Sequence, residues 1–306
     1  MTARILHRLR SDAASSARLR GIMLLLAGTA TIAIMDALVK LMSASYGTLQ
    51  LVWGRYVTQA ILLFVVIAPR RSQRHLCTRH LPLHLFRVCA LLSANVIFFA
   101  ALRSMSLADA NAIFFSSPLL ITLFAAVMLR ETVGIRRWIA VATGFAGVML
   151  VMQPGLGTLR WTTLLPFVAA ICSALYHITT PIMARHEDPA NTLYFLALLA
   201  GIGLSFAVPF YWTPLTGPGA LALLAIGTLG TIGHFLLIRA FQSTPAATLS
   251  PFLYVYLIWA TLLGWLVFGD LPAVSTIVGA LVIFGSGLYV YRQSGYAADV
   301  ADAETH

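Results

Sequence analysis

The sequence predicts an all-α integral membrane protein with ten transmembrane helices, arranged as two inverted repeats of five helices each. Three observations lead to this class. Apolar residues make up 59% of the 306 residues and charged residues only 10%, whereas a soluble domain carries about 25% charged residues. Ten windows of the chain are apolar over the length of a membrane span. A long internal repeat divides the chain into two halves.

The ten windows follow one another along the whole chain. A bilayer core requires roughly 20 consecutive apolar residues per helix. The windows that meet this requirement are 21–44, 48–68, 83–103, 108–129, 136–152, 161–184, 191–212, 218–239, 246–268 and 273–291. We number the predicted helices one to ten in this order.

The internal repeat pairs residues 95–131 with residues 234–270. When the two copies are aligned without a gap, Ala101–Ser104 falls on Ala240–Ser243. Each copy ends at an acidic residue, Glu131 in the first and Asp270 in the second. A repeat of this length indicates two related halves. Because each half holds an odd number of helices, the second half must enter the membrane in the opposite sense. Inverted repeats are typical of secondary transporters, which bind their substrate near the midplane between the halves.

The predicted organisation has five parts. Residues 1–20 form a basic tail that is mobile or lies on the membrane surface; their sequence is not a cleaved signal peptide, because the apolar run that follows is a full span long. The two modules cover residues 21–153 and 161–292, and the linker 154–160 joins them. Residues 293–306 form an acidic tail that we expect to be disordered.

The net charge of +10 is a topology signal. Fifteen of the twenty Lys and Arg residues fall on one side of the ten-helix arrangement, whereas Arg103 and Arg160 fall on the other. Such an excess marks the cytoplasmic side. We therefore expect both termini in the cytoplasm, a multi-pass protein of the bacterial inner (plasma) membrane, and no nucleic-acid partner.

Helix one carries the most informative group of polar residues. Thr29, Ala33, Asp36, Lys40 and Ser43 lie at helical spacing on one face. A carboxylate in hydrocarbon is costly, so this face should point at protein or water. One interpretation is a substrate- or proton-binding carboxylate in a polar pathway. The other is an internal Asp36–Lys40 pair that fixes packing.

Helix six carries a second polar face, with Ser173, Tyr176, His177 and Thr180. A shift of about 140 residues places Tyr176 on Asp36. The face is either the opposite wall of the same cavity or a hydrogen-bonded packing seam between membrane helices.

Asn95 in helix three and His234 in helix eight occupy matching positions of the repeat. Each is either a cavity residue or a structural polar residue. Pro118 and Pro251 lie inside helices four and nine, where a proline removes a backbone donor. Each proline is either a hinge or a static kink. The aromatic side chains near them face either the pathway or lipid.

The candidate residues form two sets. The predicted cavity residues are Asp36, Lys40, Asn95, Phe99, Phe115, Ser117, Tyr176, His177, His234 and Tyr254, and the predicted hinges are Pro118 and Pro251.

Several other features predict structure more than chemistry. Arg55 lies near the outer end of helix two, where its long side chain is expected to reach the membrane surface. Glu131 and Asp270 are interpreted as structural acids at helix ends. The small residues of helices five and ten permit close helix contact, as a buttress or a dimer face. The three cysteines lack metal-ligand spacing, so neither a metal nor a disulfide is predicted.

The repeated pattern resembles a known family. The residues Ala101–Ser106 (ALRSMS), a proline in an apolar helix, Leu129–Glu131 and Gly144–Gly147 (GFAG) resemble the EamA module, as does Arg55 after Trp53-Gly54. Two such modules in tandem are similar to the ten-helix members of the drug/metabolite transporter superfamily. The resemblance implies a central cavity lined mainly by helices one, three, four, six, eight and nine.

The resemblance implies a secondary transporter that exports or facilitates transport of amino acids, with aromatic and neutral ones as candidates, or of similar small metabolites by alternating access. The alternative is a proton-coupled multidrug or cation antiporter, in which Asp36 would carry the proton. Lys40 argues against the alternative, because an adjacent ammonium keeps the acid ionised and repels cations. An enzyme is not expected, since no nucleophile–base set or phosphate loop is recognisable. We expect no cofactor and a monomer or weak homodimer.

Overall fold

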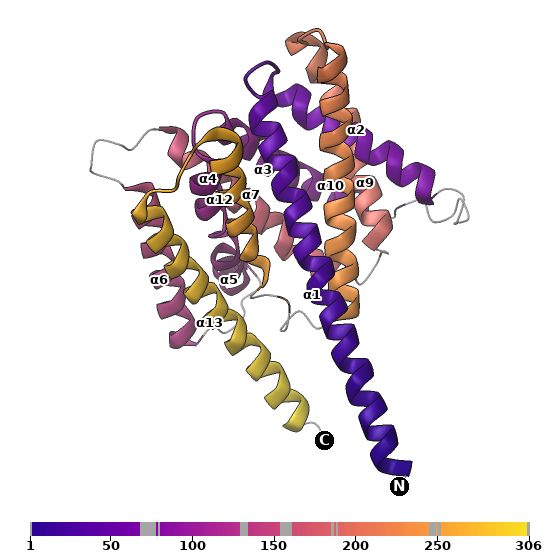
Figure 1. Cartoon of the computed structure of the whole chain (residues 1–306), viewed down its shortest axis with the longest axis vertical. Coiled ribbons are helices and arrows are strands. Elements are labelled where there is room, and N and C mark those ends of the chain that lie inside the picture. Colours follow the sequence, from indigo (N-terminus) through magenta and orange to yellow (C-terminus); the bar gives the residue numbers. More distant parts are fainter. Residues whose placement is uncertain are drawn as a thin grey trace.

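The computed structural model describes residues 2–67, 78, 80–128, 134–153, 161–184, 187, 189–244, 249 and 252–304, and the regular structure there is helical. The helices are α1 (Thr2–Met42), α2 (Thr48–Ile67), α3 (Leu81–Leu102), α4 (Leu107–Phe114), α5 (Ser117–Met128), α6 (Ile135–Met152), α7 (Trp161–Ile178), α8 (Thr180–Ala184), α9 (Pro189–Ala207), α10 (Gly217–Ser243), α12 (Val255–Phe268) and α13 (Val274–Glu304), with a short 3₁₀ helix η3 (Val208–Tyr211). Figure 1 shows that both termini lie at the same end of the bundle.

The predicted ten-helix membrane fold is confirmed. In the described part of the chain, α4 with α5 and α7 with α8 each make one predicted window, and each remaining α-helix matches one window. Six of the segments are both long and apolar enough to cross a bilayer, and three shorter apolar helices add to them. Large apolar side chains such as Phe206, Ile258 and Leu281 are exposed on the outside of the bundle, where lipid would cover them.

The first and last helices extend into the predicted tails. α1 begins at Thr2 and α13 continues to Glu304, so both ends of the described chain are helical. The physical reason is local: residues 1–20 are rich in Ala, Arg and Leu and residues 293–306 contain four Ala, and these residue types have high helix propensity.

The fourth predicted helix is divided at Phe115 and Ser116, which lie between α4 and α5. Pro118 explains the position of this break. Because proline has no N–H, the carbonyl of Phe114 four residues earlier receives no helical hydrogen bond there. The backbone turns instead, and Ser116 donates its N–H to the carbonyl oxygen of Ile113 (3.0 Å).

A comparable turn precedes α12 in the second half, at Tyr254. The N–H of Leu257 bonds to the carbonyl oxygen of Tyr254 there (3.0 Å). The predicted hinge Pro251 lies outside the described residues. Both halves thus interrupt the helix that carries their proline motif.

Helix packing follows the predicted relation between the halves. The first half packs α1 against α10, and the second half packs α7 against α3. Likewise α1 packs against α12 as α7 packs against α5, and α2 packs against α10 as α9 packs against α3. In each pair, the second contact is the first one with every helix replaced by its counterpart in the other half. The bundle therefore has an approximate two-fold axis, and the interior between the halves is where that axis passes.

Helices α6 and α13 form the close buttress expected from their small residues. A Cβ atom added to Gly147 would lie 2.9 Å from the carbonyl oxygen of Gly279, and one added to Gly279 would lie 2.6 Å from that of Gly147. The two backbones are in direct contact at these glycines, as small residues permit in membrane helix pairs.

Candidate functional site: a polar cavity between the two halves

A cavity of about 250 Å³ lies between the halves. Its walls come from α2 and α3 of the first half and from α7 to α10 of the second. The polar and aromatic residues that line it are Arg55, Tyr56, Gln59, Arg87, Tyr176, His177, Thr180, Glu187, Thr192 and His234. Polar groups at such depth in a membrane protein are costly unless they serve a ligand or a pathway.

Arg55 is anchored on the deep wall of this cavity. Its Nη1 donates a hydrogen bond to Oδ1 of Asn95, and Nδ2 of Asn95 donates to the hydroxyl oxygen of Tyr56 (2.8 Å). The Arg55 side chain is only 5% exposed, so the prediction that it reaches the membrane surface is wrong. Asn95 offers an acceptor in the interior, and Gly230 of α10 leaves room, since a Cβ there would lie 3.3 Å from Nε of Arg55.

Arg87 forms the second basic position of the cavity. Its side chain is 1% exposed. Nη1 donates to the hydroxyl oxygens of Thr179 and Thr180, each at 3.1 Å, and the guanidinium carbon lies 4.3 Å from the centroid of the Tyr176 ring. Sequence reasoning did not single out Arg87 as a candidate site residue. The available signal was an arginine in the second turn of an apolar helix.

Asp36 is buried, as the polar face of helix one predicted, but it does not pair with Lys40. The hydroxyl of Tyr256 in α12 donates a hydrogen bond to Asp36 Oδ2. Lys40 instead pairs with Asp270, with 2.6 Å between Nζ and Oδ2. The interpretation of an internal Asp36–Lys40 pair, one of the two left open by the sequence, is therefore wrong. Because α12 packs against α1, Tyr256 of α12 binds Asp36, and Asp270, which follows α12, binds Lys40.

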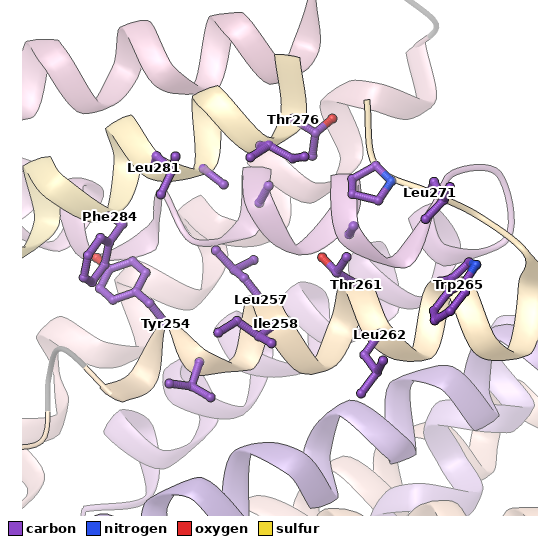
Figure 2. A pocket seen from close by; sticks show the side chains of 16 residues that line it. Tyr254, Leu257, Ile258, Thr261, Leu262, Trp265, Leu271, Thr276, Leu281 and Phe284 are labelled. Atoms are coloured by element: carbon purple, nitrogen blue, oxygen red, sulfur yellow. The ribbon is translucent and has the colours of Figure 1, made fainter. Parts of the chain in front are cut away.

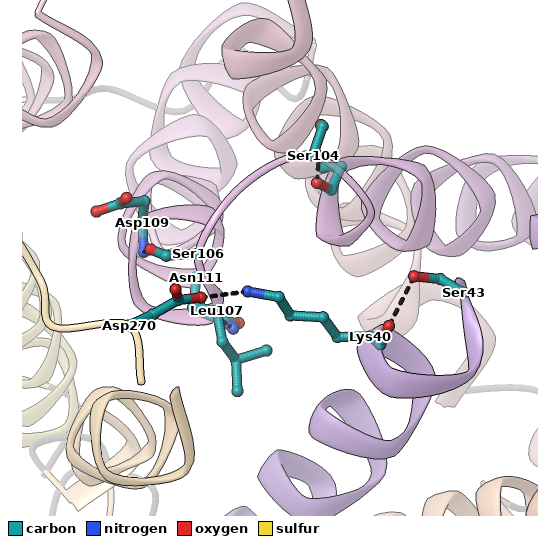
Figure 3. Close-up of polar contacts among 9 residues, drawn as sticks. Lys40, Ser43, Ser104, Ser106, Leu107, Asp109, Asn111 and Asp270 are labelled. Carbon is teal, nitrogen blue, oxygen red and sulfur yellow. Dashed lines mark hydrogen bonds and ion pairs between the residues drawn. The ribbon is translucent and has the colours of Figure 1, made fainter. Parts of the chain in front are cut away.

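The Lys40–Asp270 pair is shown in Figure 3. Lys40 is in the last turn of α1, at the end of this helix that lies away from the termini (Figure 1). Lys40 Nζ also lies 4.5 Å from the centroid of the Phe268 ring. Two further bonds close the same end: Gln50 Nε2 donates to the carbonyl oxygen of Thr213 (2.9 Å), and the Tyr46 hydroxyl bonds to Thr216 Oγ1 (3.1 Å). Each of these contacts joins the first half to the second.

The other end of the cavity carries an acid. Glu187 follows α8, and its carboxylate accepts hydrogen bonds from the Thr78 hydroxyl and from Nε2 of His84, the latter at 2.8 Å. Burial alone would raise the pKa of Glu187, but the bonds from Thr78 and His84 and the positive charges of His84 and His80 together lower this pKa below its ordinary value of 4.5.

A second, apolar pocket of about 580 Å³ lies between α4, α12 and α13 (Figure 2). Tyr254 lines it, with its ring 4.7 Å from that of Phe284 and 5.4 Å from that of Phe115. Several of its side chains, such as Trp265 and Leu281, are exposed on the lipid-facing surface. Its lining is mostly apolar and suits contact with apolar chains; the polar groups that line it include the hydroxyls of Tyr254, Thr261 and Thr276. Among the described residues, no group of three His, Cys, Asp and Glu could hold a metal ion.

Two tandem family matches agree with the two halves of this architecture. The profile of the EamA-like transporter family matches residues 19–153 and again residues 160–292. The chain belongs to the EamA-like transporter family. It is thus a membrane transporter of the drug/metabolite transporter superfamily, as the resemblance of its sequence motifs predicted.

Characterised relatives cover nearly the whole of this EamA-like transporter. It is 27% identical to a riboflavin transporter of Vibrio cholerae, over 89% of this chain and 93% of the relative. It is 26% identical to a pseudopaline exporter of Pseudomonas aeruginosa (86% and 93%) and 25% identical to an S-adenosylmethionine uptake transporter of Rickettsia prowazekii (89% and 92%). A protein of known crystal structure shares the fold at a TM-score of 0.62 and 17% identity, over 90% of this chain and 96% of that protein.

The predicted site residues of this EamA-like transporter fall into three places. Tyr176, His177 and His234 line the central cavity. Asn95 supports two lining residues, and Phe99 is buried with its ring 5.7 Å from the Arg55 guanidinium. Asp36, Lys40, Phe115, Ser117, Pro118 and Tyr254 do not line this cavity.

Proposed function

We propose that this EamA-like transporter moves a small polar metabolite across the bacterial inner membrane by alternating access through the central cavity. The observation that carries the proposal is the polar cavity between two inverted halves, deep inside an apolar bundle. In transporters built from inverted repeats, the substrate site lies at the interface of the repeats. The proposal places both termini in the cytoplasm, the chain in the membrane as a monomer or weak homodimer, and no enzymatic step in its action.

Contacts at the two ends of the cavity support an alternating mechanism. The Lys40–Asp270 ion pair and the Gln50 and Tyr46 hydrogen bonds join the halves at the end opposite the termini. The His84–Glu187 contact joins them at the other end. Rocking of one half against the other would break one set of contacts while it strengthens the other, and the cavity would open to each side in turn.

The walls of the cavity suggest the kind of substrate. Tyr56, Tyr176 and His234 offer aromatic faces and hydrogen bonds, which suit a molecule with a flat or apolar part and several polar atoms. Amino acids, predicted from the sequence, fit this description, and so do riboflavin and S-adenosylmethionine, which are named for two of the relatives. Because the relatives include both an exporter and an uptake transporter, the net direction follows the gradient that the cell supplies.

Transport into liposomes tests the proposal. Purified protein is reconstituted, and uptake of labelled aromatic and neutral amino acids, riboflavin and S-adenosylmethionine is measured with and without an imposed pH gradient. We expect saturable uptake of at least one compound above the level of protein-free liposomes. Movement of a lipophilic cation alone, driven by a proton gradient, would replace this proposal with a cation–proton antiporter.

A variant connects the transport to the cavity. Replacement of Tyr176 by Ala removes an aromatic wall of the cavity, whereas replacement of Tyr289 by Ala changes an exposed tyrosine on α13. The first change should raise KM or abolish uptake, and the second should leave uptake within about two-fold of the wild type, as is usual for surface positions.

A further inference from the structure

Two positive charges in the central cavity make no ion pair with an acid among the residues that the structure describes. The side chains of Arg55 and Arg87 are 5% and 1% exposed. In the part of the chain that the structure describes, the ion pairs are Lys40–Asp270 and His84–Glu187, and neither involves these arginines. An unpaired charge buried in a membrane protein is strongly unfavourable, which is why such residues generally mark a substrate or ion pathway.

Each guanidinium also keeps an unused donor. A guanidinium has five N–H donors. Arg55 uses Nη1 to bind Asn95, and Arg87 uses Nη1 to bind Thr179, Thr180 and the carbonyl oxygen of Tyr176. The Nε atoms of both arginines are buried and have no hydrogen-bond partner among the described residues. The neutral acceptors around them anchor both side chains but do not balance their charge.

The nearby acids are committed to other residues. Asp36 is near enough to Arg55 to attract it electrostatically, but it makes no ion pair with this arginine; it accepts the hydroxyl of Tyr256 and does not line the cavity. Glu187 is bound by Thr78 and His84. The cavity wall therefore includes two guanidinium groups, and their spare Nε donors are buried in this conformation. A carboxylate or phosphate group is the chemistry that fits, since its oxygens accept two parallel N–H bonds from arginine and bring the missing charge.

The two arginines lie toward opposite ends of the same cavity. Arg87 is in the second turn of α3, one turn after His84, whose contact with Glu187 marks one end of the cavity. Arg55 is in the first half of α2, which begins at the opposite end. An anionic group that enters from either side would therefore meet an arginine.

We propose that the central cavity binds a substrate with a carboxylate or phosphate group, and that Arg55 and Arg87 hold its negative charge. This inference rests on the proposed transport through the cavity and narrows its substrate class to anions and zwitterions. It disfavours a purely cationic drug, which two unpaired guanidinium groups would repel.

Matched pairs of compounds test the inference on the wild-type protein. The pairs are riboflavin 5′-phosphate with riboflavin, phenylalanine with phenylalanine amide, and S-adenosylmethionine with its decarboxylated form. Each is offered to the reconstituted protein, with transport as the readout. We expect at least one anionic or zwitterionic member to be transported, and its counterpart to lose about ten-fold or more in apparent affinity.

Variants assign the effect to the two arginines. Arg55→Gln and Arg87→Gln should each reduce the ten-fold preference for the member with the carboxylate or phosphate toward one. Arg55→Lys and Arg87→Lys keep the charge and should keep part of the preference, although lysine lacks the bidentate geometry. Arg103→Gln removes an equal charge at an exposed position outside the cavity and should leave the preference unchanged.

The possible results distinguish failure of this inference from failure of the proposed function. Equal transport of the members with and without the anionic group, or transport of only the member without it, overturns the inference while the proposed function stands. Transport of none of the six compounds, together with proton-driven movement of a lipophilic cation, overturns both. A preference that survives in both Gln variants shows that other residues hold the anion and also overturns the assignment. Because the compound pairs are compared on the wild type, the first test does not depend on any variant folding.

Discussion

Each charged side chain in the interior of this transporter is held by a residue from a distant part of the chain or from a neighbouring helix. Asp36 is bound by Tyr256, Lys40 by Asp270, and Arg55 by Asn95. Membrane burial makes such partners necessary, because neither water nor lipid can satisfy these groups. These contacts therefore give the most direct tests at the scale of single residues.

The Lys40–Asp270 pair should behave as a latch at the end opposite the termini. Lys40→Met or Asp270→Asn removes the attraction that joins the two halves there. We expect a cysteine introduced at Ser43 to react faster with a membrane-impermeant thiol reagent in either variant, in a background without native cysteines. The Lys40→Asp/Asp270→Lys double variant restores opposite charges and should recover slow labelling. Fast labelling in the double variant, or slow labelling in the single ones, contradicts the latch.

The Asp36–Tyr256 bond gives a second residue-scale prediction. Asp36→Asn keeps an oxygen that can accept the Tyr256 hydroxyl, whereas Asp36→Ala leaves that buried hydroxyl without its acceptor. We expect Asp36→Ala to lower the free energy of unfolding by about 1–3 kcal/mol. Asp36→Asn should cost less. Thermal unfolding in detergent micelles measures both, and equal losses would mean that the carboxylate charge, not the hydrogen bond, matters here.

At the scale of helices, the close contact of α6 and α13 depends on two glycines. Gly147→Ala or Gly279→Ala would place a methyl group within 3 Å of the opposing backbone, and a backbone cannot move aside as a side chain can. Overpacking of this kind costs about 1–3 kcal/mol. Gly285→Ala on the same helix α13 is the matched control, because nothing lies within 4 Å of a Cβ there.

The measurement is the melting temperature of each glycine variant in the same detergent. We expect Gly147→Ala and Gly279→Ala to melt below the wild type and Gly285→Ala to melt at or above it, because alanine favours the helix. A normal melting temperature for Gly147→Ala and Gly279→Ala would show that the two helices can separate at no cost. Their role as a rigid buttress would then be lost.

Helix positions followed from the sequence, whereas side-chain partners did not. The apolar windows and the repeat were sufficient to predict the ten helical segments, and helical spacing was sufficient to predict the polar face of helix one. These patterns could not identify the side-chain partners. Tyr256, the partner of Asp36, lies 220 positions along the chain, and Asp270, the partner of Lys40, lies 230 positions along. A pattern within one helix shows which face is polar, but the rotation and packing of other helices decide what that face meets.

The same limit explains the two arginines. Arg55 was expected to reach the membrane surface because its long side chain can do so at low cost. In the structure the facing helix offers Asn95 as an acceptor, and Gly230 leaves space beside the guanidinium. Neither feature has a signal in the sequence around Arg55 itself.

For the whole molecule, contacts between the halves lie at both ends of one cavity. The contact at the end of the termini includes an acid with a lowered pKa, Glu187, held by Thr78 and His84. The strength of the Glu187 contact therefore depends on pH. In the proposed alternating mechanism, a change of pH alone would shift the balance between the forms that open to either side.

The sign of this pH effect follows from the direction of the shift. A carboxylate whose pKa is lowered in the folded contact stabilises it above the ordinary pKa of 4.5, and the stabilisation is lost as the pH falls through the lower, folded value. Acidification below about pH 4.5 should therefore weaken the Glu187 contact. A cysteine introduced at Thr180, which lines the cavity near this end, should react faster with a thiol-exchange reagent that is active in acid as the pH is lowered through this range.

Two variants separate the Glu187 contact from general acid denaturation. Glu187→Gln cannot lose a charge, so its labelling rate at Thr180→Cys should be high and independent of pH in this window. Thr78→Val removes a hydrogen bond that favours the ionised form and should move the midpoint of the transition upward toward 4.5. If Glu187→Gln shows the same pH dependence as the wild type, another group controls this end of the cavity. If Thr78→Val leaves the midpoint in place, the lowered pKa arises from the histidines alone.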